Sequence, residues 1–320
     1  MIAAPVEHLP VLADEAIELL HVQPGGIYVD CTVGLGGHSE RILQEMRGRG
    51  RLVGLDRDKR AIALTRDRLS GYNKSFDLHH DNFKNLSLVL RNLEIEAIDG
   101  CLVDMGVSSY QLKNSDRGFS FREDGPLDMR MDPEQRLKAE DLVNRLSAKE
   151  LADIFRKYGE ERQAVRISQA IVERRKEGEF HSTLQLAKLV ETVKGRRKGS
   201  RIHPATQIFQ ALRIQVNQEL DALDTFLSQT IALLRAGGRM IVISFHSLED
   251  RIVKNTFQLE AGKCICFKPG ELCSCPRKSN IEILTRKPVT PSLRELEENP
   301  RARSAKLRAV QRINTLTKSD

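Results

Sequence analysis

The chain has 320 residues, 40% of them hydrophobic and 30% charged, a balance that supports a packed core and excludes disorder throughout. Its apolar runs stay well short of the roughly 20 residues that cross a bilayer, and its first ten residues lack a signal-peptide pattern, so we expect a cytoplasmic protein without a membrane partner. The net charge is +7, with 21 basic against 16 acidic residues over 112–204 and 9 against 4 over 286–320, which favours a polyanion such as nucleic acid over ordinary solvated helix faces.

The first predicted elements are a short helix and a buried strand. The helix covers 15–20, with Asp14 as its cap, and a Pro-Gly-Gly turn ends it. The apolar run 27–30 then predicts a strand that ends on Asp30.

A glycine turn and a second helix follow this strand. Gly34, Gly36 and Gly37 lie in the turn, and the helix covers 39–46. Glycine permits positive φ and leaves no Cβ in the way, and a helix N-terminus offers unpaired N–H groups, so a ligand can approach the backbone here. A tight turn that binds nothing is the alternative at this point, because a short glycine pattern is a weak signal.

Three more predicted strands also end on acidic residues. With their exit loops they cover 51–56, 76–83 and 98–104, and their acids are Asp56, Asp81 and Asp104. Ligands bind at the carboxyl ends of parallel strands, so we expect these acids to share one edge of an α/β sheet with Asp30. Asp56 stands 20 residues after Gly36, the spacing at which a carboxylate accepts both hydroxyls of an adenosine ribose.

The α/β rhythm stops near residue 112. A segment rich in glycine, proline and alternating charge comes first, and such long irregular segments are usually functional. Helical patterns then run to residue 204. We therefore predict a helical insertion over 113–204 within one α/β domain, which is formed by 1–112 and 205–320.

The α/β pattern resumes with one long amphipathic helical stretch over 205–236. A strand over 239–247, a helix over 248–258 and an extended segment over 282–290 follow, before a basic tail.

The glycine turn favours a cationic adenosine ligand over a phosphate. A phosphate-binding loop needs Gly-Lys-Ser/Thr, where this chain has Gly37, His38 and Ser39, and Ser39 also takes the third glycine position of a dinucleotide fingerprint. Asp30 would repel a pyrophosphate, but it suits the positive groups of S-adenosylmethionine. We expect S-adenosylmethionine as the cofactor, with a nicotinamide-dependent oxidoreductase as the alternative.

Motifs along most of the chain resemble the RsmH (MraW) methyltransferase family. They include DCTVGLGGHS, RGFSF-x-x-DGPLDMRMD, HPAT-x-x-FQALRI, ISFHSLEDRIVK and NPRARSAKLR. Members of this family methylate N4 of a cytidine in the decoding region of 16S ribosomal RNA, using S-adenosylmethionine. The resemblance implies a Rossmann-like class I methyltransferase sheet with an inserted helical domain, and a small ribosomal subunit as the partner.

The resemblance also implies a set of cofactor-binding residues. The methionine part would meet Gly36, Gly37 and His38, the ribose would meet Asp56, the adenine would meet Phe83, and Asp104 and Gln111 would complete the site. From the loop itself we add Asp30 and Gly34. Core packing is the alternative for Phe83, and a surface position at a helix N-terminus is the alternative for His38.

Asp104 is also a candidate for the chemistry. The N4 amine is a poor nucleophile, so an enzyme must align it, stabilise its developing charge and remove a proton. Many amino methyltransferases carry Asp/Asn-Pro-Pro-aromatic after the fourth strand, and Asp104 holds the corresponding place here. Our hypothesis is that Asp104 accepts a hydrogen bond from the amine, with Ser108 or nearby carbonyls assisting.

Five further residues are candidates for contact with the RNA substrate. Arg117, Arg122 and Arg130 in the irregular segment would meet phosphates. His246 and Ser247 would border the substrate, unless they form an ordinary strand-to-helix turn. A non-catalytic RNA-binding assembly factor with the same surfaces is a second alternative, and the sequence leaves a homo-oligomer open.

Four cysteines cluster late in the chain, in two Cys-x-Cys pairs. They are Cys264, Cys266, Cys273 and Cys275. Four thiols around a Pro-Gly turn predict a tetrahedral structural zinc site, with free or redox-active thiols as the alternative.

Overall fold

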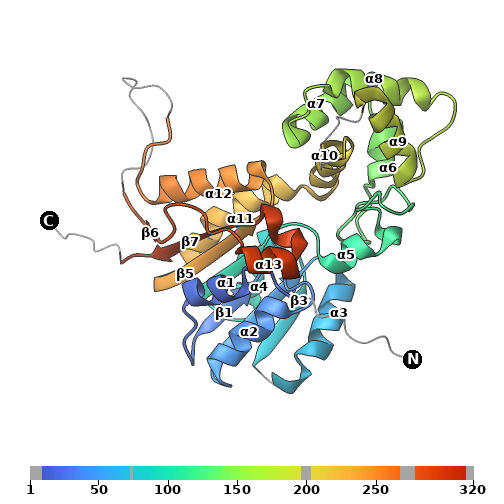
Figure 1. Ribbon diagram of the computed structural model, residues 1–320. Coiled ribbons are helices and arrows are strands. Elements are labelled where there is room, and N and C mark those ends of the chain that lie inside the picture. Colours follow the sequence, from blue (N-terminus) through green and yellow to red (C-terminus); the bar gives the residue numbers. More distant parts are fainter. Residues whose placement is uncertain (1–8, 73–74, 196–202, 267–277, 315–320) are drawn as a thin grey trace. The chain divides into compact units, whose positions relative to one another are not determined.

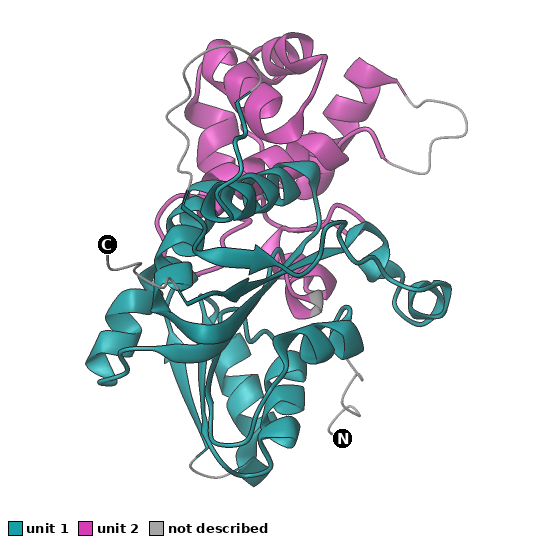
Figure 2. Cartoon of the chain, turned by 90° about the vertical axis from the view of Figure 1, so that its left-hand side faces the viewer, with its two compact units in different colours: residues 1–106, 220–320 teal, residues 107–219 magenta. Residues whose placement is uncertain are grey.

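The chain forms two compact units in the computed structural model (Figures 1 and 2). The structure describes residues 9–72, 75–195, 203–266 and 278–314. The first unit contains 1–106 and 220–320, and the second contains 107–219. The second unit thus interrupts the first along the chain, and it extends the predicted insertion at both ends. Within the described ranges, no helix combines the length and apolarity needed to cross a membrane.

The first unit is built on one sheet whose described strands follow the order β3-β2-β1-β4-β5-β7-β6. Strands β1 to β5 run parallel, whereas β7 lies antiparallel between β5 and β6. The strands are β1 Ile27–Asp30, β2 Arg51–Asp56, β3 Phe76–His80, β4 Ile98–Asp104, β5 Leu234–Ser244, β6 Ile281–Ile283 and β7 Lys306–Arg312. The order 3-2-1-4-5 is that of a doubly wound sheet, which brings the carboxyl ends of β1, β2 and β4 together.

Helices cover both faces of this sheet (Figure 1). One core lies under α1 and α2, with the C-terminal end of α3 and the segment after α13, and the other core lies under α4, α11 and α12. The helices are α1 Ala13–Leu20, α2 Gly37–Met46, α3 Lys59–Arg68, α4 Leu86–Asn92, α11 Glu219–Leu233, α12 Ser247–Glu260 and α13 Leu293–Glu298. These layers confirm the predicted Rossmann-like α/β fold.

The predicted basic tail is in fact part of the sheet. Strand β7 buries Leu307, Ala309 and Val310 between β5 and β6. Two of its cations are neutralised within the unit, because Asp250 accepts hydrogen bonds from Arg308 Nε at 2.7 Å and from Lys306 Nζ at 3.1 Å. The positive charge of this segment is therefore weaker evidence for a polyanion partner than the sequence suggested.

Two predicted helix boundaries are wrong. Asp14 does not cap α1, because the helix already begins at Ala13 and Asp14 lies in its first turn, where it pairs with Arg41. The long helical stretch is two helices, α10 Thr206–Asn217 and α11, separated by Gln218 with φ 51°.

The second unit is helical after an irregular segment. Its helices are α5 Ser109–Lys113, α6 Ala139–Arg145, α7 Ala148–Gly159, α8 Ala164–Arg174, α9 Thr183–Lys194 and α10. Ser147 and Ser182 cap α7 and α9. Helix α10 packs closely on α7, since a Cβ at Gly159 would lie 2.6 Å from the carbonyl oxygen of Gln207. This packing explains why α10 belongs to the second unit.

Candidate active site at the carboxyl edge of the sheet

Asp30, at the end of β1, is hydrogen-bonded to residues on either side of the glycine turn. Its side chain is fully buried, and its carboxylate accepts hydrogen bonds from Ser39 Oγ at 2.6 Å and from the Thr32 N–H at 3.2 Å. Burial raises the pKa of Asp30, and the nearby Asp104 carboxylate raises it further. The carboxylate has no exposed surface and positions the loop, and its predicted contact with the cofactor stays a prediction.

The glycines are required by the turn and its packing. Gly34 has φ 54°, and its carbonyl accepts a hydrogen bond from Thr65 Oγ1 at 2.9 Å. Gly36 has φ 79°, and a Cβ there would lie 3.0 Å from Thr65 Cγ2. At Gly37 a Cβ would lie 3.1 Å from the ring of Pro10. Larger residues at these positions would push the loop away from α3 and from the N-terminal segment.

Asp56, at the end of β2, is tied to the same turn. Its two carboxylate oxygens accept hydrogen bonds from the Gly34 N–H at 2.9 Å and from the Asp58 N–H at 2.8 Å. Burial raises the pKa of Asp56 to about 6, although these two N–H groups act in the opposite direction. Each oxygen keeps a further lone pair, so the ionised group can still accept ligand hydroxyls.

Asp81 and Phe83 follow β3. The carboxylate of Asp81 accepts hydrogen bonds from the Asn82 N–H at 2.6 Å and from Asn85 Nδ2 at 2.7 Å, so it shapes the exit loop. The Phe83 ring packs edge-on against Phe226, with 5.1 Å between ring centroids, and is only 7% exposed. Phe83 is therefore a core residue in the free protein, and its adenine contact stays a prediction.

His38 and Asp104 carry polar atoms at this edge that lack a hydrogen-bond partner among the described residues. His38, near the start of α2, is 5% exposed, and its Nε2 lies 3.7 Å from Asp104 Oδ2. Within the described residues neither ring nitrogen of His38 has a hydrogen-bond partner, and neither does Asp104 Oδ1. The Asp104 side chain is 23% exposed and its N–H donates to Thr32 Oγ1 at 2.7 Å. A carboxylate that is fixed at its backbone and open at its side chain can accept a proton or a hydrogen bond.

Ser108 and Gln111 belong to the second unit, where they form a capping box at the start of α5. Ser108 Oγ accepts a hydrogen bond from the Gln111 N–H at 3.2 Å, and Gln111 Oε1 accepts one from the Ser108 N–H at 3.0 Å. This local structural role accounts for both residues, so their catalytic and cofactor-binding roles stay predictions.

Two arginines of the irregular segment bind to other residues of the same segment. Arg117 is 8% exposed and donates from Nη2 to the carbonyls of Arg130 and Met131, at 3.0 and 2.9 Å. Arg130 forms a bidentate ion pair with Asp128, in which both bonds measure 2.8 Å. The prediction that Arg117 and Arg130 meet phosphates is therefore revised for both, whereas Arg122 is exposed.

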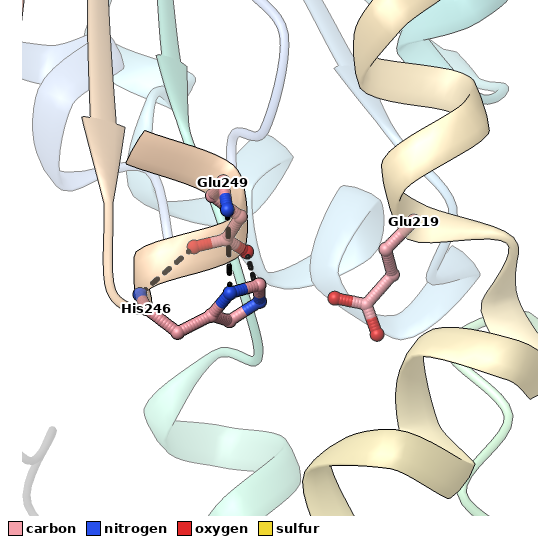
Figure 3. Close-up of side chains that lie close together, drawn as sticks. All are labelled: Glu219, His246 and Glu249. Atoms are coloured by element: carbon pink, nitrogen blue, oxygen red, sulfur yellow. Dashed lines mark hydrogen bonds and ion pairs between the residues drawn. The ribbon is translucent and has the colours of Figure 1, made fainter. Parts of the chain in front are cut away.

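His246 and Ser247 start α12 (Figure 3). His246 is its N-cap, accepting from the Glu249 N–H at 3.3 Å, and its Nε2 lies 3.1 Å from the fully buried Glu249 carboxylate. Glu249 in turn accepts the His246 N–H at 3.2 Å. This is the strand-to-helix turn that was the alternative to substrate contact. Glu219, also drawn in Figure 3, pairs with Arg213 at 2.9 Å within the second unit.

The cysteine cluster is only partly visible. Cys264 and Cys266 are exposed, whereas Cys273 and Cys275 lie outside the described residues. The predicted zinc site consequently stays a prediction.

Sequence reasoning missed the residues that support this edge. Thr32 and Ser39 lie inside the glycine motif, and their hydroxyls bond to the Asp104 N–H and to the Asp30 carboxylate. Small polar residues beside strand-terminal acids are the signal that points to them. Glu295 of α13 accepts the Leu12 N–H at 2.7 Å across a separation of 283 residues, and nothing local in the sequence indicates this pairing.

The chain matches known proteins over nearly its whole length. The sequence model of the MraW methylase family matches residues 5–313. The protein named ribosomal RNA small subunit methyltransferase H in Carboxydothermus hydrogenoformans is 48% identical, with 96% of this chain and 98% of the relative covered. The protein of the same name in Syntrophotalea carbinolica is 50% identical, with the same coverage of both chains. Among solved structures, an rRNA methylase from Streptococcus thermophilus is similar with a TM-score of 0.43 and 11% identity, over 98% of this chain and 99% of that one.

Proposed function

The chain belongs to the MraW methylase family, and from that premise we propose that it transfers a methyl group from S-adenosylmethionine to 16S ribosomal RNA of the small subunit. The names of its relatives support this substrate, and they align over almost their full length. At the finer level we propose N4 of a cytidine in the decoding region as the acceptor, which is the activity of the family that the motifs resemble. Such a substrate implies a cytoplasmic enzyme.

The observation that carries the proposal is the set of acids around the glycine turn. Asp30, Asp56 and Asp104 end three neighbouring parallel strands, and the turn between them is half-buried at Gly34. A negative site of this kind suits a ligand with a sulfonium and an ammonium group, and it disfavours a pyrophosphate. We assign the ribose to Asp56 and the methionine part to the turn from Gly36 to His38, with Phe83 and Gln111 completing the cofactor site.

The chemistry requires a proton acceptor at the amine. S-adenosylmethionine supplies an electrophilic methyl group. The lone pair of N4 forms the new C–N bond, the C–S bond breaks with its electron pair on sulfur, and N4 then loses a proton. We assign the hydrogen bond that stabilises the amine to Asp104, whose Oδ1 has no partner within the described residues. Ser108 is proposed as an assisting group.

We assign RNA recognition to the second unit. Residues 112–204 carry 21 basic against 16 acidic residues. Arg122 is exposed on the irregular segment, and it is the one residue of the three predicted phosphate contacts that the fold leaves in solvent. Phosphate contacts by exposed cations would position the RNA, while the first unit performs the transfer.

A tritium-transfer assay tests the function. Small subunits and naked 16S RNA from cells that lack this protein are incubated with labelled S-adenosylmethionine, and the product nucleoside is identified. We expect N4-methylcytidine at one position. RNA binding without transfer would indicate the non-catalytic assembly factor, and thermal stabilisation by NAD but not by S-adenosylhomocysteine would indicate the oxidoreductase.

Elemental analysis of the purified protein tests the structural zinc that we propose for Cys264, Cys266, Cys273 and Cys275. About one zinc per chain is the expected result, lost when Cys264 and Cys266 are replaced by serine. Protein without zinc would leave these residues as free thiols.

A further inference from the structure

The imidazole of His38 is the least satisfied buried side chain at the carboxyl edge of the sheet. It is 5% exposed, yet neither Nδ1 nor Nε2 has a hydrogen-bond partner within the described part of the chain. Buried polar atoms in folded proteins are nearly always bonded, because an unpaired one costs roughly 1–3 kcal/mol. A buried histidine without hydrogen bonds, at the edge where a ligand is expected, indicates that its ring interacts with a group that the free protein lacks.

Carboxyl groups on three different elements interact with the charge of this imidazole. Asp104 of β4 lies 3.7 Å from its Nε2, and Asp30 of β1 and Glu295 of α13 interact with it electrostatically. The Asp30 carboxylate accepts hydrogen bonds from Ser39 Oγ and the Thr32 N–H, and Glu295 Oε1 accepts one from the Leu12 N–H.

Asp104 differs from the other two acids. Its Oδ1 has no partner among the described residues, its Oδ2 lies 3.7 Å from His38 Nε2, and its side chain is partly exposed. Of the three acids, Asp104 is therefore the one that can face a substrate and His38 at the same time.

We propose that His38 receives, through Asp104, the proton that the substrate amine loses during methyl transfer. The inference rests on the proposed function and adds the destination of the proton. The N4 proton moves to the Asp104 carboxylate and then to Nε2 of neutral His38. The resulting imidazolium lies beside the Asp104 carboxylate, and it returns the proton to water after the product has left. His38 is a positioning residue in this scheme, since it acts on the amine only through Asp104.

The geometry supports transfer between the two groups. The 3.7 Å gap is longer than a hydrogen bond, and a small side-chain rotation closes it once a substrate fills the edge. Surrounding acids stabilise the imidazolium that forms, as a buried carboxylate does for a catalytic histidine. A purely structural histidine would instead carry a hydrogen bond to the fold, as His246 does at the start of α12.

His38→Gln separates this role from cofactor binding. Glutamine keeps a polar amide near the position of Nε2, but it cannot take up a proton. We expect kcat to fall by about 100-fold or more. Because His38 also borders the proposed methionine site, the affinity for S-adenosylhomocysteine is measured by calorimetry and should fall by a much smaller factor than kcat. His21→Asn, at the exposed end of α1, is the matched control and keeps full activity.

A second measurement does not depend on activity. The ring ¹⁵N signals of His38, identified by their absence in His38→Gln, should shift in Asp104→Asn, and unchanged signals would overturn the coupling. A His38→Gln enzyme with wild-type kcat, or one weakened only in cofactor affinity, would likewise overturn the inference while leaving the proposed function intact. If the wild type transfers no methyl group to any ribosomal RNA substrate, the proposed function fails first.

Discussion

The carboxyl edge of the first unit and the irregular segment of the second unit both gather charged residues, but they use them differently. In the segment, Arg117 donates hydrogen bonds to backbone carbonyls and Arg130 forms an ion pair with Asp128. At the sheet edge, the carboxylates of Asp30 and Asp56 accept hydrogen bonds from N–H groups of the glycine turn. The ring nitrogens of His38 and Asp104 Oδ1 have no hydrogen-bond partner within the described residues. The difference shows that a run of charge does not by itself mark a site. What marks it is a buried or half-buried polar atom that the fold leaves unpaired.

The largest expected effect is at Asp104. Asp104→Asn keeps the shape of the side chain but removes its ability to accept a proton, so kcat should fall by about 10²–10⁴-fold, while the protein stays folded and binds S-adenosylhomocysteine. Asp224→Asn, an exposed acid on α11, is the control and should leave kcat unchanged. Near-normal methylation by Asp104→Asn in the tritium assay would remove Asp104 from the mechanism.

Arg117 should affect stability rather than catalysis. Arg117→Met leaves the carbonyls of Arg130 and Met131 without their donor, which should lower the free energy of unfolding of the second unit by about 1–3 kcal/mol. Urea denaturation followed by circular dichroism measures the change. The exposed Arg122→Met is the control, with an expected change within about 0.5 kcal/mol. Equal stability of both variants would contradict the structural role of Arg117.

Asp56 should make cofactor affinity depend on pH. Its pKa is raised to about 6, so the carboxylate is ionised above that pH and becomes protonated below it. Since only the carboxylate accepts both ribose hydroxyls, affinity for S-adenosylhomocysteine should be highest above about pH 6 and decline as the pH falls through 6. Calorimetry from pH 5 to 8 measures this. Asp56→Asn should bind about tenfold more weakly, a loss near 1.4 kcal/mol, with little dependence on pH. A wild-type affinity that is constant over this range would speak against Asp56 as the ribose ligand.

The smallest expected effect is at Arg122. As an exposed phosphate contact, Arg122→Ala should weaken binding to ribosomal RNA a few-fold and reduce the salt dependence of binding by about one unit of slope. The affinity for S-adenosylhomocysteine should not change. Filter binding over a salt series measures the effect, and an unaltered slope would place the RNA contacts elsewhere on the second unit.

Local patterns made much of the first unit predictable from the sequence. The strands that end on Asp30, Asp56 and Asp104 are apolar runs closed by an acid, and the turn between them is marked by its glycines. The break near residue 112 and the helical patterns after it predicted the discontinuous arrangement of the chain, and the family motifs imply the same.

Tertiary pairing explains what the sequence did not indicate. Strand β7 was hidden because Lys306 and Arg308 gave its segment the appearance of a solvated tail, although Asp250 neutralises both. Nothing in the sequence indicates the break at Gln218, where one residue with positive φ separates α10 from α11. The approach of His38 to Asp104 joins residues 66 positions apart on different elements, so it depends on the packing of α2 against β1 and on the pairing of β1 with β4.

Strand β7 sets the order in which the first unit is completed during synthesis. Strands β1 to β4 leave the ribosome first, then the whole second unit, then β5, and only the last segment, Lys306–Arg312, covers the free edge of β5. Until residue 312 has emerged, the nascent chain carries β5 as an open edge strand, which is a template for pairing with other chains. Chains that end before Lys306 should therefore aggregate rather than merely lose activity.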